Sequence, residues 1–323
     1  MSTDRQTFYR QVDRQLAQDV QKGLSTFPKS LPSKYFYNAE GSRIFQQIME
    51  LEEYYPTNCE FEILTTQKAL ILDSLPSAFD LVELGAGDGL KTKILLKHFL
   101  NKQIDFKYLP IDISVDILHV LKYSLEDEMP ELRVQTLHDD YFGALQKISS
   151  LTHRPKVVLF LGGNIGNFSL VEAQAFLTKL RASLNKGDFL LMGIDLIKNP
   201  ETILHAYSDS EGVTAAFNYN LLQRINDELD ANFDISQFMH FANYEPQTGE
   251  TKSYLISKIN QKVWIKGLQM DIHFDAWESI HTELSQKFSV PQIVDMAFNT
   301  GFKVKNHFFD TAQYFTDTLW EAV

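Results

Sequence analysis

The strongest chemical signal in the sequence is a glycine-rich segment, Glu83-Leu84-Gly85-Ala86-Gly87-Asp88-Gly89. It follows an apolar run at 79–84, typical of a buried strand, and precedes a stretch at 89–100 with helical periodicity. Glycines at a strand-to-helix turn let the backbone bend sharply and approach a bound ligand closely. We therefore expect a ligand-binding loop here, with Gly85 and Gly87 on the ligand side.

Two acidic positions extend this signal along the chain. Asp112 follows the next predicted strand, at 106–111, and Asp139-Asp140-Tyr141 follows a third, at 132–137. A carboxylate at Asp112 can accept hydrogen bonds from both hydroxyls of a ribose, while Asp140 and Tyr141 can hold an adenine. Because open α/β sheets bind ligands at the carboxyl ends of their strands, these positions predict a site for a nucleoside-bearing ligand. The alternative is a glycine-rich turn with two solvated loop aspartates.

The spacing of the glycines distinguishes between two nucleoside cofactors. The fingerprint of dinucleotide-binding proteins has its third glycine one residue later than Gly85-x-Gly87-x-Gly89. Asp88, at the start of the following helix, would also repel a phosphate. S-adenosylmethionine carries a nucleoside but no pyrophosphate, so we predict it as the cofactor. An NAD-dependent oxidoreductase is disfavoured by this spacing and by the lack of a clear catalytic dyad.

The elements that position these residues alternate between strand and helix. A fourth strand is predicted at 156–161, a helix capped by Ser169 at 169–183, and a fifth strand at 188–194. Such alternation is typical of an α/β fold with a doubly wound, mostly parallel, Rossmann-like sheet. We expect an amphipathic helix at 8–23 before this region and another at 42–49.

The alternation is lost after Asp195, which predicts a second unit. A helical stretch at 213–228 is followed by short strand-like runs at 254–259, 262–265 and 268–274. A helix at 289–301 and a closing pair of strands at 303–309 and 314–320 then return to the first pattern. We therefore predict an inserted α+β substrate-binding domain formed by 1–57 and 198–286. The cofactor-binding domain comprises 58–197 and 287–323.

The composition limits the possible partners. The 323 residues include 42 acidic and 30 basic side chains, a formal net charge of -12, so nucleic acid and anionic membranes are disfavoured as partners. Cys59 is the only cysteine, which excludes an intrachain disulfide, and no cluster of His, Cys and carboxylate residues suggests a metal. No apolar run approaches the roughly 20 residues that span a membrane. We expect a cytoplasmic monomer that acts on a small molecule.

Six motifs spread over nearly the whole chain carry a specific resemblance. They are Leu31-Pro32-Ser33-Lys34-Tyr35-Phe36-Tyr37, Glu53-Tyr54-Tyr55-Pro56-Thr57, Leu81-Val82-Glu83-Leu84-Gly85-Ala86-Gly87, Phe160-Leu161-Gly162-Gly163-Asn164-Ile165-Gly166-Asn167, Gly212-Val213-Thr214-Ala215-Ala216-Phe217-Asn218 and Thr282-Glu283-Leu284-Ser285-Gln286-Lys287-Phe288. With these motifs the chain resembles the histidine-specific Nα-methyltransferases, which make trimethylhistidine (hercynine) for ergothioneine biosynthesis. The resemblance implies a methyltransferase domain together with a substrate-binding domain.

The resemblance also implies roles for individual residues. On the cofactor side it implies Gly85, Gly87, Lys91, Asp112, Asp140 and Tyr141. On the substrate side it implies Tyr37, Phe45, Tyr54, Asn167, Tyr207, Glu283 and Ser285, with Asn167 and Tyr37 in catalysis. Taken alone, Asn167 is equally typical of a turn or helix cap, and the aromatic residues are equally typical of packing.

The two polar residues Glu283 and Ser285 bear on the identity of the substrate. They lie two positions apart in a probable strand and therefore share a face. A carboxylate and a hydroxyl on one face can hold both imidazole nitrogens of histidine, and would reject amino acids that leave them unpaired. On spacing alone, an exposed polar strand face is the alternative.

Two departures from the family pattern keep other substrates open. Asp88-Gly89 stands where relatives carry small hydroxyl residues, and Ser253 stands where they carry a bulkier apolar residue. One alternative is therefore an N-methyltransferase of another aromatic amine, such as a tryptophan derivative, whose indole offers a single donor. The alternative of another class is a non-catalytic nucleoside-binding protein, because this fold hosts many functions.

Overall fold

The computed structural model describes residues 14–151 and 154–323. The chain divides into two compact units. Unit 1 comprises the chain up to Tyr54 and Asn199–Leu284, and unit 2 comprises Tyr55–Lys198 and Ser285–Val323. The predicted domain boundaries lie close to the points where the chain passes from one unit to the other. The functional roles given to the two units stay predictions.

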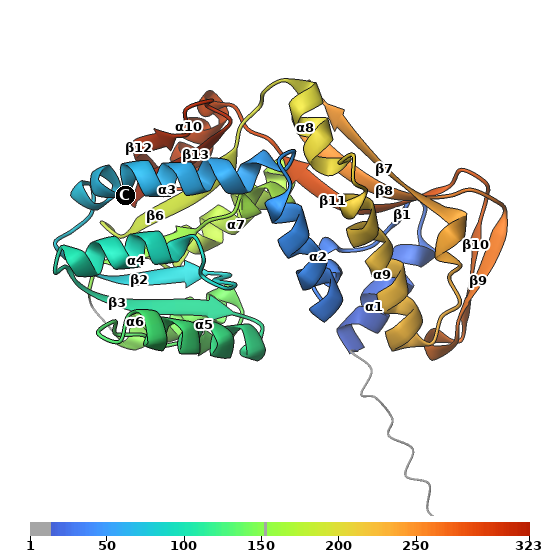
Figure 1. Cartoon of the computed structure of the whole chain (residues 1–323), viewed down its shortest axis with the longest axis horizontal. Helices are drawn as coiled ribbons and strands as arrows, with labels where there is room; N and C mark the ends of the chain where they lie inside the picture. Colours follow the sequence, from blue (N-terminus) through green and yellow to red (C-terminus); the bar gives the residue numbers. More distant parts are fainter. Residues whose placement is uncertain (1–13, 152–153) are drawn as a thin grey trace, which may run out of the picture. The chain divides into compact units, whose positions relative to one another are not determined.

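A seven-stranded sheet forms the centre of unit 2 (Figure 1). Its strands, in spatial order, are β12 (Phe302–Phe309), β13 (Phe315–Ala322), β6 (Phe189–Asp195), β5 (Lys156–Phe160), β2 (Ala78–Leu84), β3 (Asp105–Asp112) and β4 (Leu137–His138). The five strands from β6 to β4 are parallel, and β12 and β13 join them in antiparallel pairing. This arrangement confirms the predicted α/β fold with a Rossmann-like sheet.

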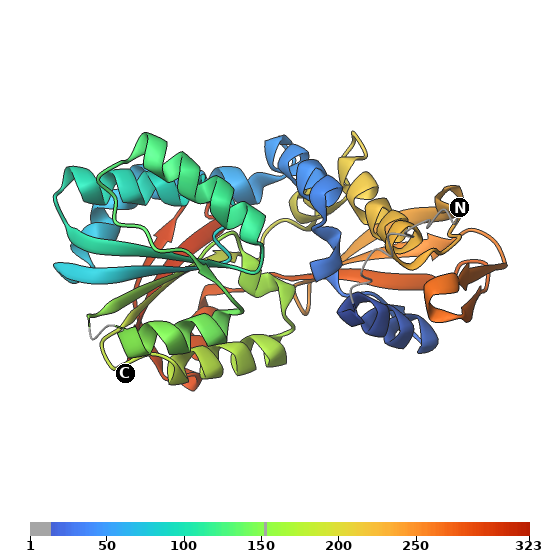
Figure 2. The ribbon, with the colours of Figure 1, turned by 90° about the horizontal axis from the view of Figure 1, so that it is seen from below.

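Helices cover both faces of this sheet (Figure 2). They are α3 (Tyr55–Asp73), α4 (Thr92–Asn101) and α5 (Val115–Glu128) on one face, and α6 (Tyr141–Leu151), α7 (Leu170–Ala182) and α10 (Val290–Asn299) on the other. The strands alternate their side chains between the two helix layers. Val82 and Leu84 of β2, for example, join a core with Leu145 of α6 and Leu177 of α7.

Unit 1 is built on a smaller sheet with strand order β1-β11-β8-β7. The strands are β1 (Lys29–Ser30), β11 (Ser279–Gln286), β8 (Glu250–Ser257) and β7 (Phe238–Glu245), and β9 (Gln261–Ile265) pairs separately with β10 (Met270–Phe274). The helices are α1 (Arg14–Ser25), α2 (Ala39–Glu50), α8 (Pro200–Tyr207) and α9 (Val213–Leu229). Short 3₁₀ turns occur in this unit at Ser33–Phe36, Ile235–Gln237 and Lys266–Leu268, and in unit 2 at Asn164–Asn167.

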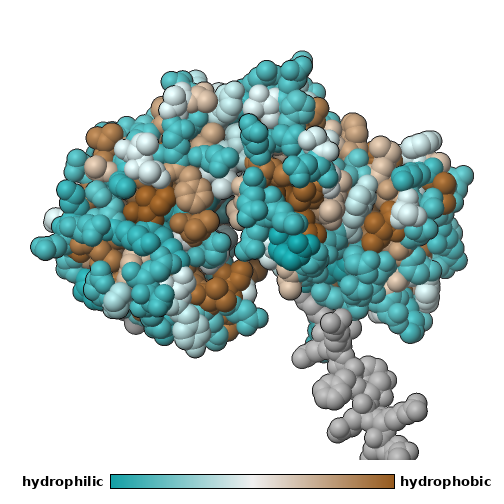
Figure 3. Space-filling model, in the orientation of Figure 1, coloured by the Kyte–Doolittle hydropathy of each residue, from teal (hydrophilic) through white to brown (hydrophobic). Residues whose placement is uncertain are grey.

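One apolar face of the small sheet packs against helices. Phe238 of β7 and Leu255 of β8 are buried together with Leu221 of α9 and Val20 of α1. Burial alternates along β8, as expected for a sheet with one face in the core. This unit confirms the predicted α+β character of the insertion. No helix among the described residues is long and apolar enough to cross a bilayer, and the face shown in Figure 3 is mostly hydrophilic.

Several boundaries differ from those predicted. Residues 8–13 of the first predicted helix lie outside the described residues. Helix α3 begins at Tyr55, before the predicted domain boundary at 57/58, because Pro56 fits its first turn, where no N–H is needed. The predicted strand at 132–137 is reduced to β4 and a bridge between Tyr108 and Val134, as is common at a sheet edge.

Candidate active site

The glycine loop follows β2 and has a backbone that only glycine adopts easily. Gly85, Gly87 and Gly89 have φ angles of 72°, 54° and 66°. A Cβ on Gly85 would lie 2.9 Å from the hydroxyl of Tyr141, whereas a Cβ on Gly87 would meet nothing within 4 Å. A Cβ on Gly89 would strike Leu121 of α5. The absence of a side chain at Gly85 therefore leaves room for the hydroxyl of Tyr141. The absence of one at Gly89 lets the loop pack against Leu121 of α5.

Asp112 joins the end of β3 to this loop. One carboxylate oxygen accepts a hydrogen bond from the backbone N–H of Ser114 at 2.9 Å, and the other accepts from the N–H of Gly87 at 3.3 Å. The side chain is half-buried and retains acceptor capacity, because a carboxylate has about four lone-pair sites. The arrangement suits the hydroxyls of a ribose held beside the loop.

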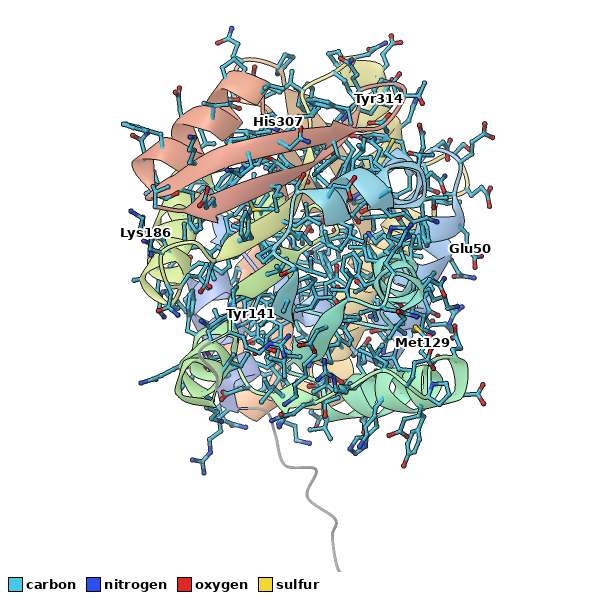
Figure 4. All side chains as sticks on the ribbon, turned by 90° about the vertical axis from the view of Figure 1, so that its left-hand side faces the viewer. Glu50, Met129, Tyr141, Lys186, His307 and Tyr314 are labelled. Carbon is cyan, nitrogen blue, oxygen red and sulfur yellow. The ribbon has the colours of Figure 1, made fainter. Side chains whose placement is uncertain are left out.

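Asp140 and Tyr141 begin helix α6. The carboxylate of Asp140 accepts from the backbone N–H groups of Phe142 and Gly143, at 2.9 and 3.0 Å, and so caps the helix. Burial, and then the negative charge of Asp112, raise the pKa of Tyr141, so its phenol stays protonated. Figure 4 shows Tyr141 well below His307 and Tyr314, and its ring lies 6.1 Å from that of Phe160 in the central strand β5. The structure thus brings Gly85, Asp112 and Tyr141 together.

Lys91 lies at the end of the same loop. Its ammonium forms an ion pair with Glu60 of α3, a fully buried residue that sequence reasoning missed. The other oxygen of Glu60 accepts from the backbone N–H of Gly162 at 2.7 Å. Glu60 therefore links the loop after β2 to the loop after β5. The sequence gives little sign of this role, because Glu62 lies two residues further along the same helix and the helix is of mixed polarity.

These residues fit S-adenosylmethionine. The loop leaves open space at Gly87, Asp112 offers carboxylate oxygens, and Tyr141 offers a ring and a protonated hydroxyl. Lys91 offers a cation suited to the carboxylate of the cofactor.

In unit 1, three residues implied on the substrate side form one aromatic cluster. The ring of Phe45 lies 5.5 Å from that of Tyr37 and 6.1 Å from that of Tyr54, both edge to face. Phe217 of α9, which was not singled out, lies 5.6 Å from Tyr37 and 5.7 Å from Phe45. Tyr37 is 50% exposed, so the cluster has an accessible edge. Tyr207 is buried at the end of α8.

The remaining implied substrate residues are held by polar neighbours. In unit 1, the hydroxyl of Ser253 donates to the carboxylate of Glu283 at 3.1 Å. In unit 2, the ammonium of Lys287 donates to the hydroxyl of Ser285 at 2.7 Å. The Asn164–Asn167 turn packs closely on this segment, because a Cβ on Gly166 would lie 3.5 Å from the Ser285 hydroxyl oxygen. The side chain of Asn167 is exposed.

A buried ionic cluster at the end of β6 was also missed. Asp195 forms ion pairs with Lys198 and with Lys287, the latter at 2.8 Å, and accepts from the hydroxyl of Tyr55 at 2.8 Å. Burial opposes ionisation of Asp195, but the two lysines outweigh it and hold its pKa below the ordinary value. Lysines near a boundary between two domains are usually expected at the surface. The sequence alone therefore does not predict this cluster.

The fold and the loop site define an α/β enzyme that binds a nucleoside-bearing cofactor. A family model described as histidine-specific methyltransferase, SAM-dependent, matches residues 16–322, and the chain belongs to this family. The match confirms the predicted family and the predicted cofactor, S-adenosylmethionine. The chain is therefore an S-adenosylmethionine-dependent methyltransferase.

Curated relatives match both units. A histidine N-alpha-methyltransferase of Mycolicibacterium smegmatis is 36% identical over 297 residues, covering 92% of each chain. One of Mycobacterium tuberculosis is 37% identical over 279 residues, covering 86% of each chain. A 4-dimethylallyltryptophan N-methyltransferase of Penicillium roqueforti is 26% identical over 293 residues, covering 87% of this chain and 86% of its own.

Proposed function

We propose that this enzyme transfers three methyl groups to the α-amino group of L-histidine and so forms Nα,Nα,Nα-trimethyl-L-histidine. The observation that carries the proposal is the likeness to histidine N-alpha-methyltransferases across both units. The relative named for a tryptophan derivative is less similar over a comparable length.

The cofactor supplies a methyl group on a sulfonium, whose transfer to an amine needs a free lone pair and correct alignment. Gly85, Gly87, Asp112, Asp140 and Tyr141 are proposed to hold its nucleoside. Lys91 is proposed to hold its carboxylate. Much of the rate enhancement then comes from positioning the two reactants.

The substrate-side residues divide into a polar and an aromatic group. Glu283 is proposed to accept the imidazole N–H, with Ser285 at the second ring nitrogen, and Asn167 to bind beside the amine. The cluster of Tyr37, Phe45 and Tyr54 is proposed to stabilise the growing cationic ammonium, by on the order of 1 kcal/mol per ring. Tyr207 is proposed to support this binding surface.

A tryptophan derivative is the second candidate substrate, because Ser253 leaves more room beside Glu283 than a bulkier residue would. Isothermal titration calorimetry with S-adenosylhomocysteine present compares L-histidine with 4-dimethylallyltryptophan directly. The proposal expects heat of binding for histidine that is lost in Glu283→Ala. If the tryptophan derivative binds and histidine does not, the tryptophan derivative replaces histidine as the proposed substrate.

Two further features stay predictions. Size-exclusion chromatography with light scattering tests the expected monomer. Fractionation of the host cell tests the expected cytoplasmic location.

A further inference from the structure

Behind the cofactor loop, unit 2 buries a pair of acids that the proposed function does not use. Glu60 of α3 is fully buried, pairs with Lys91 and accepts from the N–H of Gly162. Its carboxylate occupies the space in front of Gly193 of β6, where any Cβ would collide with it. The position of Glu60 is therefore fixed by its helix and by the loops that carry Lys91 and Gly162. The absence of a side chain at Gly193 leaves the space that its carboxylate fills.

The second acid is Asp317, in the middle of β13. It lies opposite Gly193 in the antiparallel register and is fully buried. Within residues 14–151 and 154–323, no N–H or O–H donor reaches either of its carboxylate oxygens. The carboxylate of Glu60 lies in front of Gly193, the residue directly opposite Asp317, and opposed side chains share one face of a sheet, so the two acids are neighbours.

A hydrogen bond between two carboxyl groups requires a proton on one of them. Burial, and then the negative charge of Glu60, raise the pKa of Asp317 well above its ordinary value, while Lys91 opposes the shift. Asp317 therefore keeps its proton, and its O–H can donate a hydrogen bond to the carboxylate of Glu60. The carboxylate of Glu60 faces the ammonium of Lys91 and accepts from the N–H of Gly162.

A third acid adds to the charge around Lys91. Glu83 at the end of β2 is buried and accepts hydrogen bonds from Thr92 and Tyr108. Its carboxyl group also interacts electrostatically with the ammonium of Lys91. The ammonium of Lys91, which is partly buried, thus faces three acids. A proton on Asp317 reduces the excess negative charge that would otherwise act on the cofactor side of Lys91.

We propose that Glu60 and Asp317 share one proton and together act as positioning residues for Lys91. Asp317 in its acid form orients the carboxylate of Glu60, and Glu60 in turn fixes the ammonium of Lys91 and the loop at Gly162. This inference rests on the proposed role of Lys91 in binding the cofactor. It adds two residues, on α3 and β13, to those that determine cofactor affinity.

The shared proton is tested by infrared spectroscopy of the whole protein. Well above neutral pH, where Glu83 with its pKa of about 7 is ionised, the wild type should still show the C=O stretch of a protonated carboxyl group. The band should disappear in Asp317→Asn. A wild-type spectrum without such a band, or a band that persists unchanged in this variant, would overturn the assignment.

The positioning role is tested by calorimetric binding of S-adenosylhomocysteine. Glu60→Gln should weaken binding about tenfold, as expected for a lost charged hydrogen bond, and the loss should vanish in a Lys91→Gln background. Asp317→Asn, which keeps an N–H donor toward Glu60, should retain more affinity than Asp317→Leu. Additive effects of Glu60 and Lys91, or equal affinities of the two Asp317 variants, would contradict the proposal.

A matched control separates positioning from stability. Lys156 and Asp188 form a buried ion pair elsewhere in unit 2, at 3.1 Å. Asp188→Asn should lower the melting temperature without changing the affinity for S-adenosylhomocysteine. Because this ligand is bound without histidine, failure of the positioning proposal is distinguishable from failure of the proposed substrate.

Discussion

The hydroxyl of Tyr141 lies 2.9 Å from the position that a Cβ would take on Gly85. This approach joins the loop after β2 to the start of α6, two segments separated by more than one strand and helix. Gly85→Ala should force Tyr141 to move and strain a backbone with a φ of 72°. We expect at least about tenfold weaker binding of S-adenosylhomocysteine, measured by calorimetry.

Gly187→Ala is the matched control for this variant. Gly187 also has a positive φ, of 86°, but a Cβ there would meet nothing within 4 Å. It should lower stability through backbone strain and leave cofactor affinity unchanged. Equal loss of affinity in both variants would show that strain, and not the approach to Tyr141, accounts for the effect.

Asp112 is expected to contribute a charged acceptor to the cofactor site. Asp112→Asn removes that charge and should reduce the affinity for S-adenosylhomocysteine by about tenfold to a hundredfold, because hydrogen bonds to charged groups are worth roughly 1.5–3 kcal/mol. Asp116→Asn changes an exposed acid in the first turn of α5 and serves as the control. Unchanged affinity in Asp112→Asn would remove this residue from the site.

The cluster around Asp195 is expected to support the stability of unit 2. Asp195→Asn leaves Lys198 and Lys287 buried without their counter-charge, which should cost roughly 3–5 kcal/mol of unfolding free energy. Asp230→Asn breaks an exposed ion pair with Lys266 and should leave the unfolding free energy nearly unchanged. Urea unfolding measures both, and similar losses would contradict the account.

Glu83 should make stability depend on pH. Burial raises its pKa to about 7, above the ordinary 4.5, so the folded chain binds this proton more tightly than the unfolded chain. Its contribution is therefore present at acidic pH and is lost as pH rises through about 7. The unfolding free energy of the wild type relative to Glu83→Gln should fall by up to roughly 3 kcal/mol as the pH rises from below 4.5 to above about 7. A flat difference would contradict the raised pKa.

The sequence was informative where function depends on local turns. The glycine loop, Asp112, Asp140 and Tyr141 each lie directly after a predicted strand, and parallel strands bring such positions to one edge. The alternation of strand and helix was therefore enough to predict the sheet, and it indicates the edge of the sheet where we propose the cofactor site.

The sequence was less informative where residues meet only through the fold. Glu60, Lys91 and Asp317 come from a helix, a loop and a late strand, and no spacing relates them. Asp317 alternates with threonines in a strand and reads as an exposed residue, although both faces of β13 are covered. Strand β7 and helix α6 were not predicted, although both are rich in apolar residues.

Mass spectrometry of a reaction with purified protein, S-adenosylmethionine and L-histidine tests the central claim most directly. The account predicts a product heavier than histidine by three methyl groups, abolished in Glu283→Ala and in Asn167→Ala. Glu245→Ala, an exposed acid of unit 1, should form the product as the wild type does. No methylated histidine from a protein that binds S-adenosylmethionine would contradict histidine as the substrate.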